Sequence, residues 1–209
     1  MKTTAVRIYG EKDLRLETFE LPQIKDDEIL VKIVSDSICM SSYKAAMIIE
    51  ENESIYIDSG TTAMCLAEKI PDIALAVLTC APNAAIELTN RKKVEIVLAG
   101  GRLSKDNYSV SGVVTADFIN DTNIDTAFLS TSGFSPETGF TCGSLNECEI
   151  KKAVISKAKK VVLMLEKHKI DVRHMFTFAG LDDIDVIVTD EPLPAHILKL
   201  VKEKNIKII

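Results

Sequence analysis

After Ser41, short and almost continuously apolar segments alternate with segments that have helical spacing of apolar residues. The apolar segments are expected to be strands, at residues 54–57, 74–79, 94–99, 126–130, 161–165, 186–189 and 206–209. The segments between them are expected to be helices, at residues 43–51, 61–69, 83–88, 112–120, 147–158 and 195–203. Apolar strands that alternate with helices are typical of a parallel sheet covered on both faces. The pattern therefore predicts an α/β fold with a mostly parallel sheet covered by helices.

The N-terminal residues have a different pattern, because apolar and polar side chains alternate there with a period of two. This alternation predicts three short strands joined by turns, around residues 5–9, 14–17 and 28–34. We therefore expect two parts, a short N-terminal β segment over residues 1–46 and an α/β domain over residues 47–209.

Charge limits the classes of partner. The formal net charge is −6, and the dense basic runs at residues 91–93, 151–152 and 157–160 fall at the ends or on the faces of expected helices. A protein that binds duplex nucleic acid needs clustered Lys and Arg side chains, which displace counterions from the phosphates. We expect no DNA binding by this chain alone.

The cysteines and the N-terminus bear on location and on metals. The five cysteines are scattered and form no C-x-x-C pair, which favours reduced thiols over a disulfide framework or a zinc knuckle. No signal peptide is visible, and no segment approaches the roughly 20 apolar residues that span a bilayer. These features predict a cytoplasmic protein with no membrane attachment and no cofactor.

The most informative loop is Asp58-Ser59-Gly60-Thr61-Thr62, which follows an expected strand and opens an expected helix. Backbone amides at a helix start point outward at the positive end of the dipole, and a glycine with neighbouring hydroxyls lets a phosphate approach closely. An ordinary capping loop also explains these residue types, because Asp, Ser and Thr are favoured at helix starts. The loop lacks the lysine of a P-loop and the G-x-G-x-x-G pattern, so a nucleotide site is not indicated.

Three further loops follow expected strands, at residues 79–83, 99–102 and 130–134. Ligands of parallel sheets bind beyond the carboxyl ends of the strands, so four such loops together favour a binding site. The charged segment at residues 165–169 also follows an apolar strand, and its lysine could reach a phosphate or a sugar oxygen. A solvated charged turn is the alternative for that segment.

From about residue 46 to the end, the chain resembles the effector-binding domain of the DeoR family of bacterial transcriptional regulators. The resemblance rests on segments in matching order and spacing: I-Y-I-D-S-G-T-T, A-V-L-T-C-A-P-N-A-A, V-E-I-V-L-A-G-G-R-L, S-V-S-G, D-T-A-F-L-S-T-S-G-F, E-T-G-F-T, N-E-C-E-I-K-K-A-V-I and I-V-T-D. It implies a fold similar to ribose-5-phosphate isomerase, glucosamine-6-phosphate deaminase and CoA transferases. It also implies a phosphorylated sugar or related metabolite as the effector.

The same resemblance assigns roles to residues. The loop at residues 59–62 would hold the phosphate, and Lys169 would take the lysine role of the family's D-x-S-K turn, which here reads Glu166-Lys167-His168-Lys169. Where family members have Asn after the Thr, this chain has Cys80. The complete expected ligand-binding set is Asp58, Ser59, Gly60, Thr61, Thr62, Thr79, Gly100, Gly101, Ser132, Gly133, Glu147, Lys151 and Lys169.

Residues 1–46 instead resemble the N-terminus of zinc-dependent medium-chain alcohol and sorbitol dehydrogenases of the sugar-phosphate reductase type. The matching segments are A-V-R-I-Y-G-E-K-D-L-R-L-E, E-I-L-V-K-I-V-S and S-I-C-M-S-S-Y-K. In that family the cysteine aligned with Cys39 binds the catalytic zinc, but such a site needs about three protein ligands and a Rossmann domain completes the enzyme. The later ligands and the Rossmann half are missing here. We interpret Cys39 as only a remnant zinc-ligand position, with no metal bound, in a fused or truncated gene product.

Three functions follow from these observations. The first is a regulator's sensor domain that binds a phosphorylated sugar, forms a homo-oligomer, lacks its helix-turn-helix and is not an enzyme. The second is a sugar-phosphate isomerase or deaminase, in which Glu147 and Lys169 transfer protons. The third, a zinc-dependent oxidoreductase, needs a nicotinamide site for which the sequence has no segment. The first is the expected function, and no catalytic residue is assigned.

Overall fold

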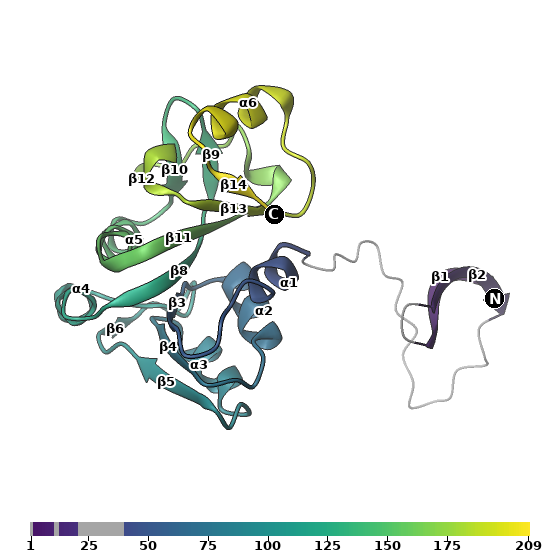
Figure 1. Cartoon of the computed structure of the whole chain (residues 1–209), viewed down its shortest axis with the longest axis horizontal. Helices are drawn as coiled ribbons and strands as arrows, with labels where there is room; N and C mark the ends of the chain where they lie inside the picture. The colour runs from purple at the N-terminus through teal and green to yellow at the C-terminus, as the bar shows by residue number, and fades with distance from the viewer. Residues whose placement is uncertain (1, 11–12, 21–39) are drawn as a thin grey trace. The chain divides into compact units, whose positions relative to one another are not determined.

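The computed structural model describes residues 2–10, 13–20 and 40–209 (Figure 1). The chain divides into two compact units, Met1–Ile38 and Cys39–Ile209. The functional boundary predicted between residues 46 and 47 stays a prediction. The third N-terminal strand, predicted around residues 28–34, and Cys39 lie outside the described residues.

The first unit contains an antiparallel hairpin. Strand β1 (Lys2–Gly10) pairs with β2 (Asp13–Glu20), with an irregularity in register between Ile8 and Gly10. Two of the three strands predicted for this part of the chain are therefore present.

The second unit is built on a seven-stranded sheet in which every pair of neighbouring strands is parallel. The strand order is β14-β13-β11-β8-β3-β4-β5 (Figure 1). The strands are β3 (Ser54–Ile57), β4 (Leu75–Thr79), β5 (Val94–Leu98), β8 (Ile124–Ser130), β11 (Ala158–Leu165), β13 (Val186–Thr189) and β14 (Lys207–Ile208). The predicted fold class is confirmed. From β3 the chain builds the sheet outward in one direction as far as β5, and from β8 it builds in the other direction as far as β14.

Six helices flank this sheet in the described part of the chain. They are α1 (Met40–Ala46), α2 (Thr61–Lys69), α3 (Pro82–Leu88), α4 (Val113–Asn120), α5 (Leu145–Lys157) and α6 (Ala195–Glu203). The helix predicted over residues 43–51 instead ends at Ala46. The amides of Ile48 and Ile49 bond back to carbonyl groups only three residues earlier, which tightens the end of that helix.

The central strands send alternate side chains to two hydrophobic cores. In β8, Phe128 packs in the core that includes residues of α1, α2 and α3. Its neighbours Ala127 and Leu129 pack in the core that includes residues of α4, α5 and α6. Because both faces of this strand are buried at its middle, residues 127–129 are continuously apolar, which is the pattern that predicted the sheet.

Several short strands were not predicted. Strands β9 (Gly133–Ser135), β10 (Gly139–Cys142) and β12 (Phe176–Ala179) form a small three-stranded sheet, and β6 (Arg102–Leu103) pairs with β7 (Val110–Ser111) as a hairpin. Two short 3-10 helices, η1 (Lys167–Lys169) and η2 (Leu181–Asp183), complete the unit. These short strands lie outside the regular alternation of apolar strands and helices from which the main sheet was predicted.

Candidate functional site

A cavity of about 400 Å³ lies beyond the carboxyl ends of β3 and β8. These two strands are neighbours in the sheet. The strands that follow β3 in the chain are added on one side of the pair, and the strands that follow β8 are added on the other side. In open α/β sheets, such a switch point leaves a crevice between the loops that follow the strands, and ligands bind there. The cavity is lined by Ser59, Gly60, Thr61, Thr62, Asn107, Ser130, Thr131, Ser132, Glu147, His168, Lys169 and Val172.

The start of helix α2 forms one wall of this cavity. Gly60 precedes the helix with a φ of 93°, a conformation that side-chain-bearing residues rarely adopt. A Cβ atom at Gly60 would meet nothing within 4 Å, so the backbone faces open space. No side chain caps the helix, and the first amides of a helix have no intrahelical acceptor. The α2 N-terminus therefore presents unused N–H groups and a positive dipole end to the cavity.

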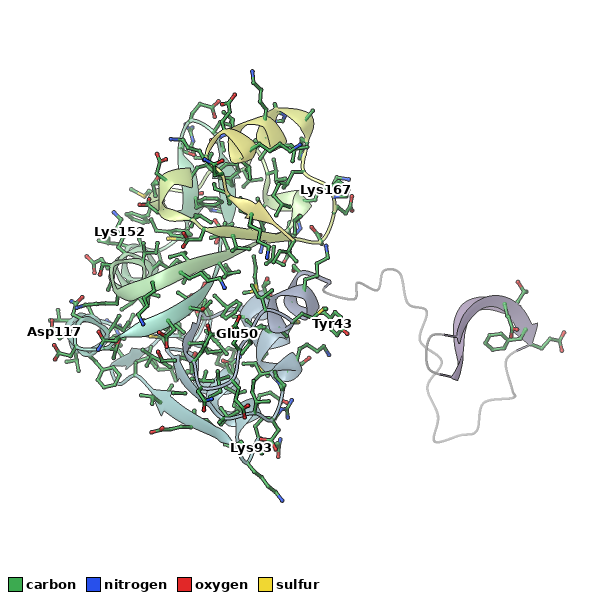
Figure 2. The ribbon with its side chains drawn as sticks, viewed as in Figure 1. Tyr43, Glu50, Lys93, Asp117, Lys152 and Lys167 are labelled. Atoms are coloured by element: carbon green, nitrogen blue, oxygen red, sulfur yellow. The ribbon has the colours of Figure 1, made fainter. Side chains whose placement is uncertain are left out.

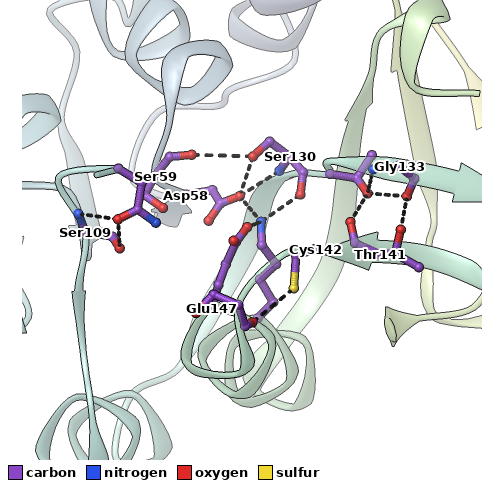
Figure 3. Close-up of polar contacts among 12 residues, drawn as sticks. Asp58, Ser59, Ser109, Ser130, Gly133, Thr141, Cys142 and Glu147 are labelled. Atoms are coloured by element: carbon purple, nitrogen blue, oxygen red, sulfur yellow. Dashed lines mark hydrogen bonds and ion pairs between the residues drawn. The ribbon is translucent and has the colours of Figure 1, made fainter. Parts of the chain in front are cut away.

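Beneath the cavity, a buried ion pair joins the two central strands to helix α5 (Figure 3). Asp58, at the end of β3, accepts an ion-paired hydrogen bond from Lys151 and two hydrogen bonds from Ser130, through its amide (2.8 Å) and its hydroxyl (2.7 Å). Lys151 also donates to the carbonyl oxygen of Ser130 at 2.7 Å. We call Asp58, Ser130 and Lys151 the floor of the site.

The Lys151 ammonium is fully buried, yet it is well compensated. Burial lowers the pKa of Lys151, but the negative charges of Asp58 and Glu147 outweigh that effect, and the pKa is raised above its ordinary value. The ring of Phe178 lies 5.0 Å from the nitrogen and adds a cation–π contact. Lys151 is therefore a permanently charged structural cation at neutral pH.

Glu147 connects the floor to the cavity. Its carboxylate lies 3.2 Å from the Lys151 nitrogen, one helical turn away on α5, and part of the side chain remains exposed. It also lines a second space of about 10 Å³ behind the floor, beside Tyr56 and Cys80. Burial raises the pKa of the Cys80 thiol to about 11, so that side chain is a neutral thiol.

The opposite wall is formed by η1. The Lys169 ammonium lies 3.4 Å from the Glu166 carboxylate, which also accepts a hydrogen bond of 2.6 Å from the Thr62 hydroxyl. This chain of contacts connects the lysine to the first turn of α2. We call residues 59–62 together with Lys169 the rim of the site.

The structure brings most of the predicted residues together. Ser59, Gly60, Thr61, Thr62, Ser132, Glu147 and Lys169 line the cavity, and Asp58 and Lys151 lie in the floor beneath it. The remaining four predicted residues are not among its lining: Thr79, Gly100, Gly101 and Gly133.

Those four residues have contacts of another kind. The buried Thr79 hydroxyl donates to the Ile57 carbonyl oxygen at 2.8 Å, which joins β4 to β3. A Cβ at Gly101 would lie 2.2 Å from the Thr115 hydroxyl, and one at Gly133 would lie 2.4 Å from the Val172 carbonyl oxygen. Both glycines allow close packing of backbone against a neighbouring segment. Gly100 accepts a hydrogen bond from Thr115 at 2.7 Å.

Five lining residues are outside the expected ligand-binding set. Ser130, Thr131 and His168 belong to loops that the sequence had indicated, whereas two others do not. Asn107 reaches the cavity from the loop of the β6–β7 hairpin, and Val172 from the segment after η1. Neither residue belongs to a loop directly after a strand of the main sheet, where ligands of parallel sheets are expected to bind. A hairpin between two-residue strands left no periodic signal that would have drawn attention to Asn107.

Two further properties concern metals and membranes. Among the described residues, no group of three His, Cys, Asp or Glu side chains is arranged to hold a metal ion. No helix in that part of the chain is long and apolar enough to cross a bilayer.

The family profile of the DeoR C terminal sensor domain matches residues 42–191. The chain belongs to this family. The match spans the cavity, its floor and its rim. It begins at residue 42, so the dehydrogenase resemblance of residues 1–46 stays a prediction.

Curated relatives are transcriptional regulators by name. The HTH-type transcriptional regulator GlpR of Haloferax volcanii is 32% identical over 160 residues, which cover 76% of this chain and 62% of that protein. The glycerol-3-phosphate regulon repressor of Escherichia coli is 26% identical over 166 residues, covering 79% of this chain and 66% of the repressor. In both cases the alignment spans less than two thirds of the relative's own length.

A solved regulator structure shares the fold at low sequence identity. A probable sor operon regulator from Shigella flexneri has a TM-score of 0.50 at 10% identity, and the match covers 77% of this chain and 89% of that one. Ribose 5-phosphate isomerase A from Methanocaldococcus jannaschii has a TM-score of 0.46 at 12% identity and covers 63% of this chain and 52% of the isomerase.

Proposed function

We propose that this domain is the sensor of a DeoR-type transcriptional regulator of sugar metabolism, and that its cavity binds a phosphorylated sugar without turning it over. The observation that carries the proposal is the convergence of the uncapped α2 N-terminus and Lys169 on one cavity. Family membership supports the regulatory role. The name of the Escherichia coli relative, a glycerol-3-phosphate regulon repressor, supports a phosphate ester as the effector.

The rim has the chemistry that a phosphate group requires. A phosphate dianion accepts hydrogen bonds from several donors, and helix-start amides supply them without the loss of side-chain entropy. The hydroxyls of Ser59 and Thr61 add donors, and the Lys169 ammonium adds a positive charge. We therefore assign the phosphate to the rim, between Gly60 and Lys169.

The remaining lining suits the hydroxylated part of the effector. Asn107, Ser132 and Glu147 present amide, hydroxyl and carboxylate groups to the cavity. Val172 is the one aliphatic side chain of its lining. A polar lining of this kind selects ligands that carry hydroxyl groups, because an apolar ligand would leave these groups without partners.

Sensing requires a ligand that binds two conformations of the protein with different affinity. The effector would draw the α2 start and η1 together, and it would bias how subunits pack. In a complete regulator that bias would change DNA binding. The charge of −6 supports the view that this chain does not itself bind DNA, and cytoplasmic location and homo-oligomer formation belong to the same proposal.

Enzymatic turnover is the competing hypothesis. Glu147 is the carboxylate of the lining, but it is engaged in an ion pair of 3.2 Å with the fully buried Lys151. We therefore propose no reaction. Incubation of the protein with an aldose phosphate, followed by a ketose assay, tests this point, and formation of ketose in proportion to protein would contradict it.

Thermal unfolding against a panel of ligands tests the proposed function. The panel contains glycerol 3-phosphate, ribose 5-phosphate and glucose 6-phosphate, each beside its parent polyol or sugar. A ligand at 100 times its dissociation constant adds about 2.7 kcal/mol to the free energy of unfolding. We expect a shift in Tm with at least one phosphate and none with its parent compound. Equal shifts for both members of each pair would remove the phosphate from the proposal.

A further inference from the structure

We propose that His168 is a second cationic ligand of the phosphate, so that the cavity binds a phosphorylated sugar more tightly when the His168 imidazole is protonated. The inference deepens the proposed function, on which it rests, because it adds a binding residue and a pH dependence to the same site. His168 precedes Lys169 in η1, and both side chains line the cavity.

One ring nitrogen of His168 faces a carboxylate, and the other is free. Nδ1 lies 3.4 Å from Oε2 of Glu166. Oε1 of the same carboxylate accepts the hydrogen bond from Thr62 and lies 3.4 Å from the Lys169 nitrogen. Within the described residues, Nε2 of His168 has no hydrogen-bond or ion-pair partner. The side chain is 71% exposed, so a ligand in the cavity can reach this nitrogen.

The Glu166 carboxylate determines what Nε2 can do. A neutral imidazole carries one N–H, and a carboxylate beside Nδ1 places that proton on Nδ1. Nε2 of the neutral ring then presents a lone pair, which repels the oxygens of a phosphate dianion. The protonated ring carries an N–H at both nitrogens, so Nε2 can donate a charge-assisted hydrogen bond. The protonated form of His168 is therefore the form that binds the dianion.

The site holds more negative than positive charge before a ligand enters. Its carboxylates are Asp58 in the floor, Glu147 in the lining and Glu166 beside Lys169. Among the described residues of the site, two ammonium groups oppose these three carboxylates, those of Lys151 and Lys169. A phosphate dianion adds to the negative excess, and an opposite charge nearby favours the charged form of a titratable group. The bound dianion therefore favours the imidazolium form of His168, and binding is coupled to the uptake of a proton.

The charged groups around His168 are carboxylates and ammonium groups. On its own element these are Glu166, Lys167 and Lys169. Across the cavity, α5 contributes the Glu147 carboxylate, whereas the start of α2 contributes hydroxyls and amides. Ordinary carboxyl and ammonium groups keep their charges between pH 6 and pH 8.5, and an imidazole loses its charge in that range. A change in affinity across that range that depends on His168 therefore reports the charge of its ring.

Affinity measured at two pH values tests the inference. Glycerol 3-phosphate, ribose 5-phosphate and glucose 6-phosphate are each titrated calorimetrically into the full chain and into a His168→Gln variant, at pH 6 and at pH 8.5. We expect the variant to bind about tenfold more weakly than the wild type at pH 6 and less than about twofold more weakly at pH 8.5. The reason is that the charge-assisted hydrogen bond exists only where the ring is charged. Ionisation of the ligand itself affects both proteins alike and cancels in this ratio.

His196→Gln is the matched control. His196 is also an exposed histidine beside a carboxylate, with Nε2 3.7 Å from Asp171, but it does not line the cavity. This variant should bind like the wild type at both pH values. An equal loss of affinity for His168→Gln at both pH values, no loss at either, or the same loss for His196→Gln would overturn the role of His168 and leave the proposed function standing. A wild-type chain that binds none of the three phosphates would remove the proposed function, and this inference with it.

Discussion

The floor and the rim of the site lie within a few residues of each other, yet they differ in how their polar groups are satisfied. In the floor, Asp58 and Lys151 are buried, and their charged groups are bonded to each other and to Ser130. In the rim, the amides at the start of α2 lack a side-chain cap, and among the described residues Lys169 forms an ion pair only with Glu166.

This difference distinguishes residues that stabilise the fold from residues that can bind a ligand, two roles that the sequence alone does not separate. A buried group with a full set of partners stabilises the fold, and it has no capacity left for a ligand. A partly exposed group with unused donors can bind an anion at little structural cost. We therefore expect changes in the floor to act mainly on stability and changes in the rim to act mainly on affinity.

Lys151→Met is expected to have the largest effect on stability. It leaves the Asp58 carboxylate buried without its cation, and removal of one partner of a buried ion pair costs about 3–5 kcal/mol in the free energy of unfolding. Urea denaturation measures this loss. The control is Lys152→Met, the next residue of α5, which is exposed (Figure 2). Equal stability of the two variants would contradict a structural role for the floor.

Lys169→Ala is expected to lower the affinity for the ligand and to leave the stability of the fold almost unchanged. The affinity for the sugar phosphate selected by the thermal panel should fall about tenfold, because one charge-assisted contact is lost, while the free energy of unfolding changes by less than about 1 kcal/mol. Calorimetric titration measures the affinity. Lys167→Ala removes a neighbouring exposed lysine of η1 that does not line the cavity. If both variants bound equally well, Lys169 would not belong to the rim.

Gly60→Ala tests the backbone of the rim. The φ of 93° strains any residue with a Cβ, at a cost of about 1 kcal/mol, and relaxation of that strain would turn the α2 amides away from the phosphate. Both stability and affinity should therefore fall modestly. Gly143→Ala is the control, because Gly143 has open space around it and no positive φ. A Gly60→Ala protein that binds like the wild type would show that the amides are not used.

The smallest expected effect concerns an ion pair remote from the floor, between Lys159 and Asp125 at 2.7 Å. The hydrogen bond from Lys159, with those from Ser54, holds the pKa of Asp125 below its ordinary value. A depressed carboxyl pKa adds stability above the unfolded-state pKa of about 3.9, and that stability is lost as the pH falls through the folded-state value.

Asp125→Asn should therefore differ from the wild type more at pH 7 than at pH 3. Urea unfolding at both pH values measures the two differences. A difference that grows toward acid would contradict the sign of this shift. The loss in the free energy of unfolding for Asp125→Asn, set beside the loss for Lys151→Met, shows how much burial adds to the strength of an ion pair.

Much of the fold could be predicted because the central strands are buried on both faces. Strand β13 and helices α2 and α6 have the predicted bounds, residues 186–189, 61–69 and 195–203. The order of the strands could not be predicted in the same way, because alternation along the chain does not say which strands are neighbours. The switch point between β3 and β8 therefore appears only in the structure.

The same limit explains which site residues were found. The loops after β3 and β8 meet because these strands are adjacent, and they contribute Ser59 and Ser132 to the cavity. The loops after β4 and β5 are displaced toward the edge of the sheet, and Thr79 and Gly100 do not line the cavity. Residue types at strand ends identify the correct edge of a sheet, but only tertiary packing selects the loops that share a site.

The central claim is that the phosphate of the effector sits on the start of α2. Amide NMR spectra of the isotope-labelled full chain test it most directly, during titration with the sugar phosphate selected by the thermal panel and, separately, with its parent sugar. The account predicts that the largest shift changes fall on Gly60, Thr61 and Thr62, and that the parent sugar leaves these amides unmoved. Changes confined to amides outside the cavity lining, or equal changes with both compounds, would contradict it.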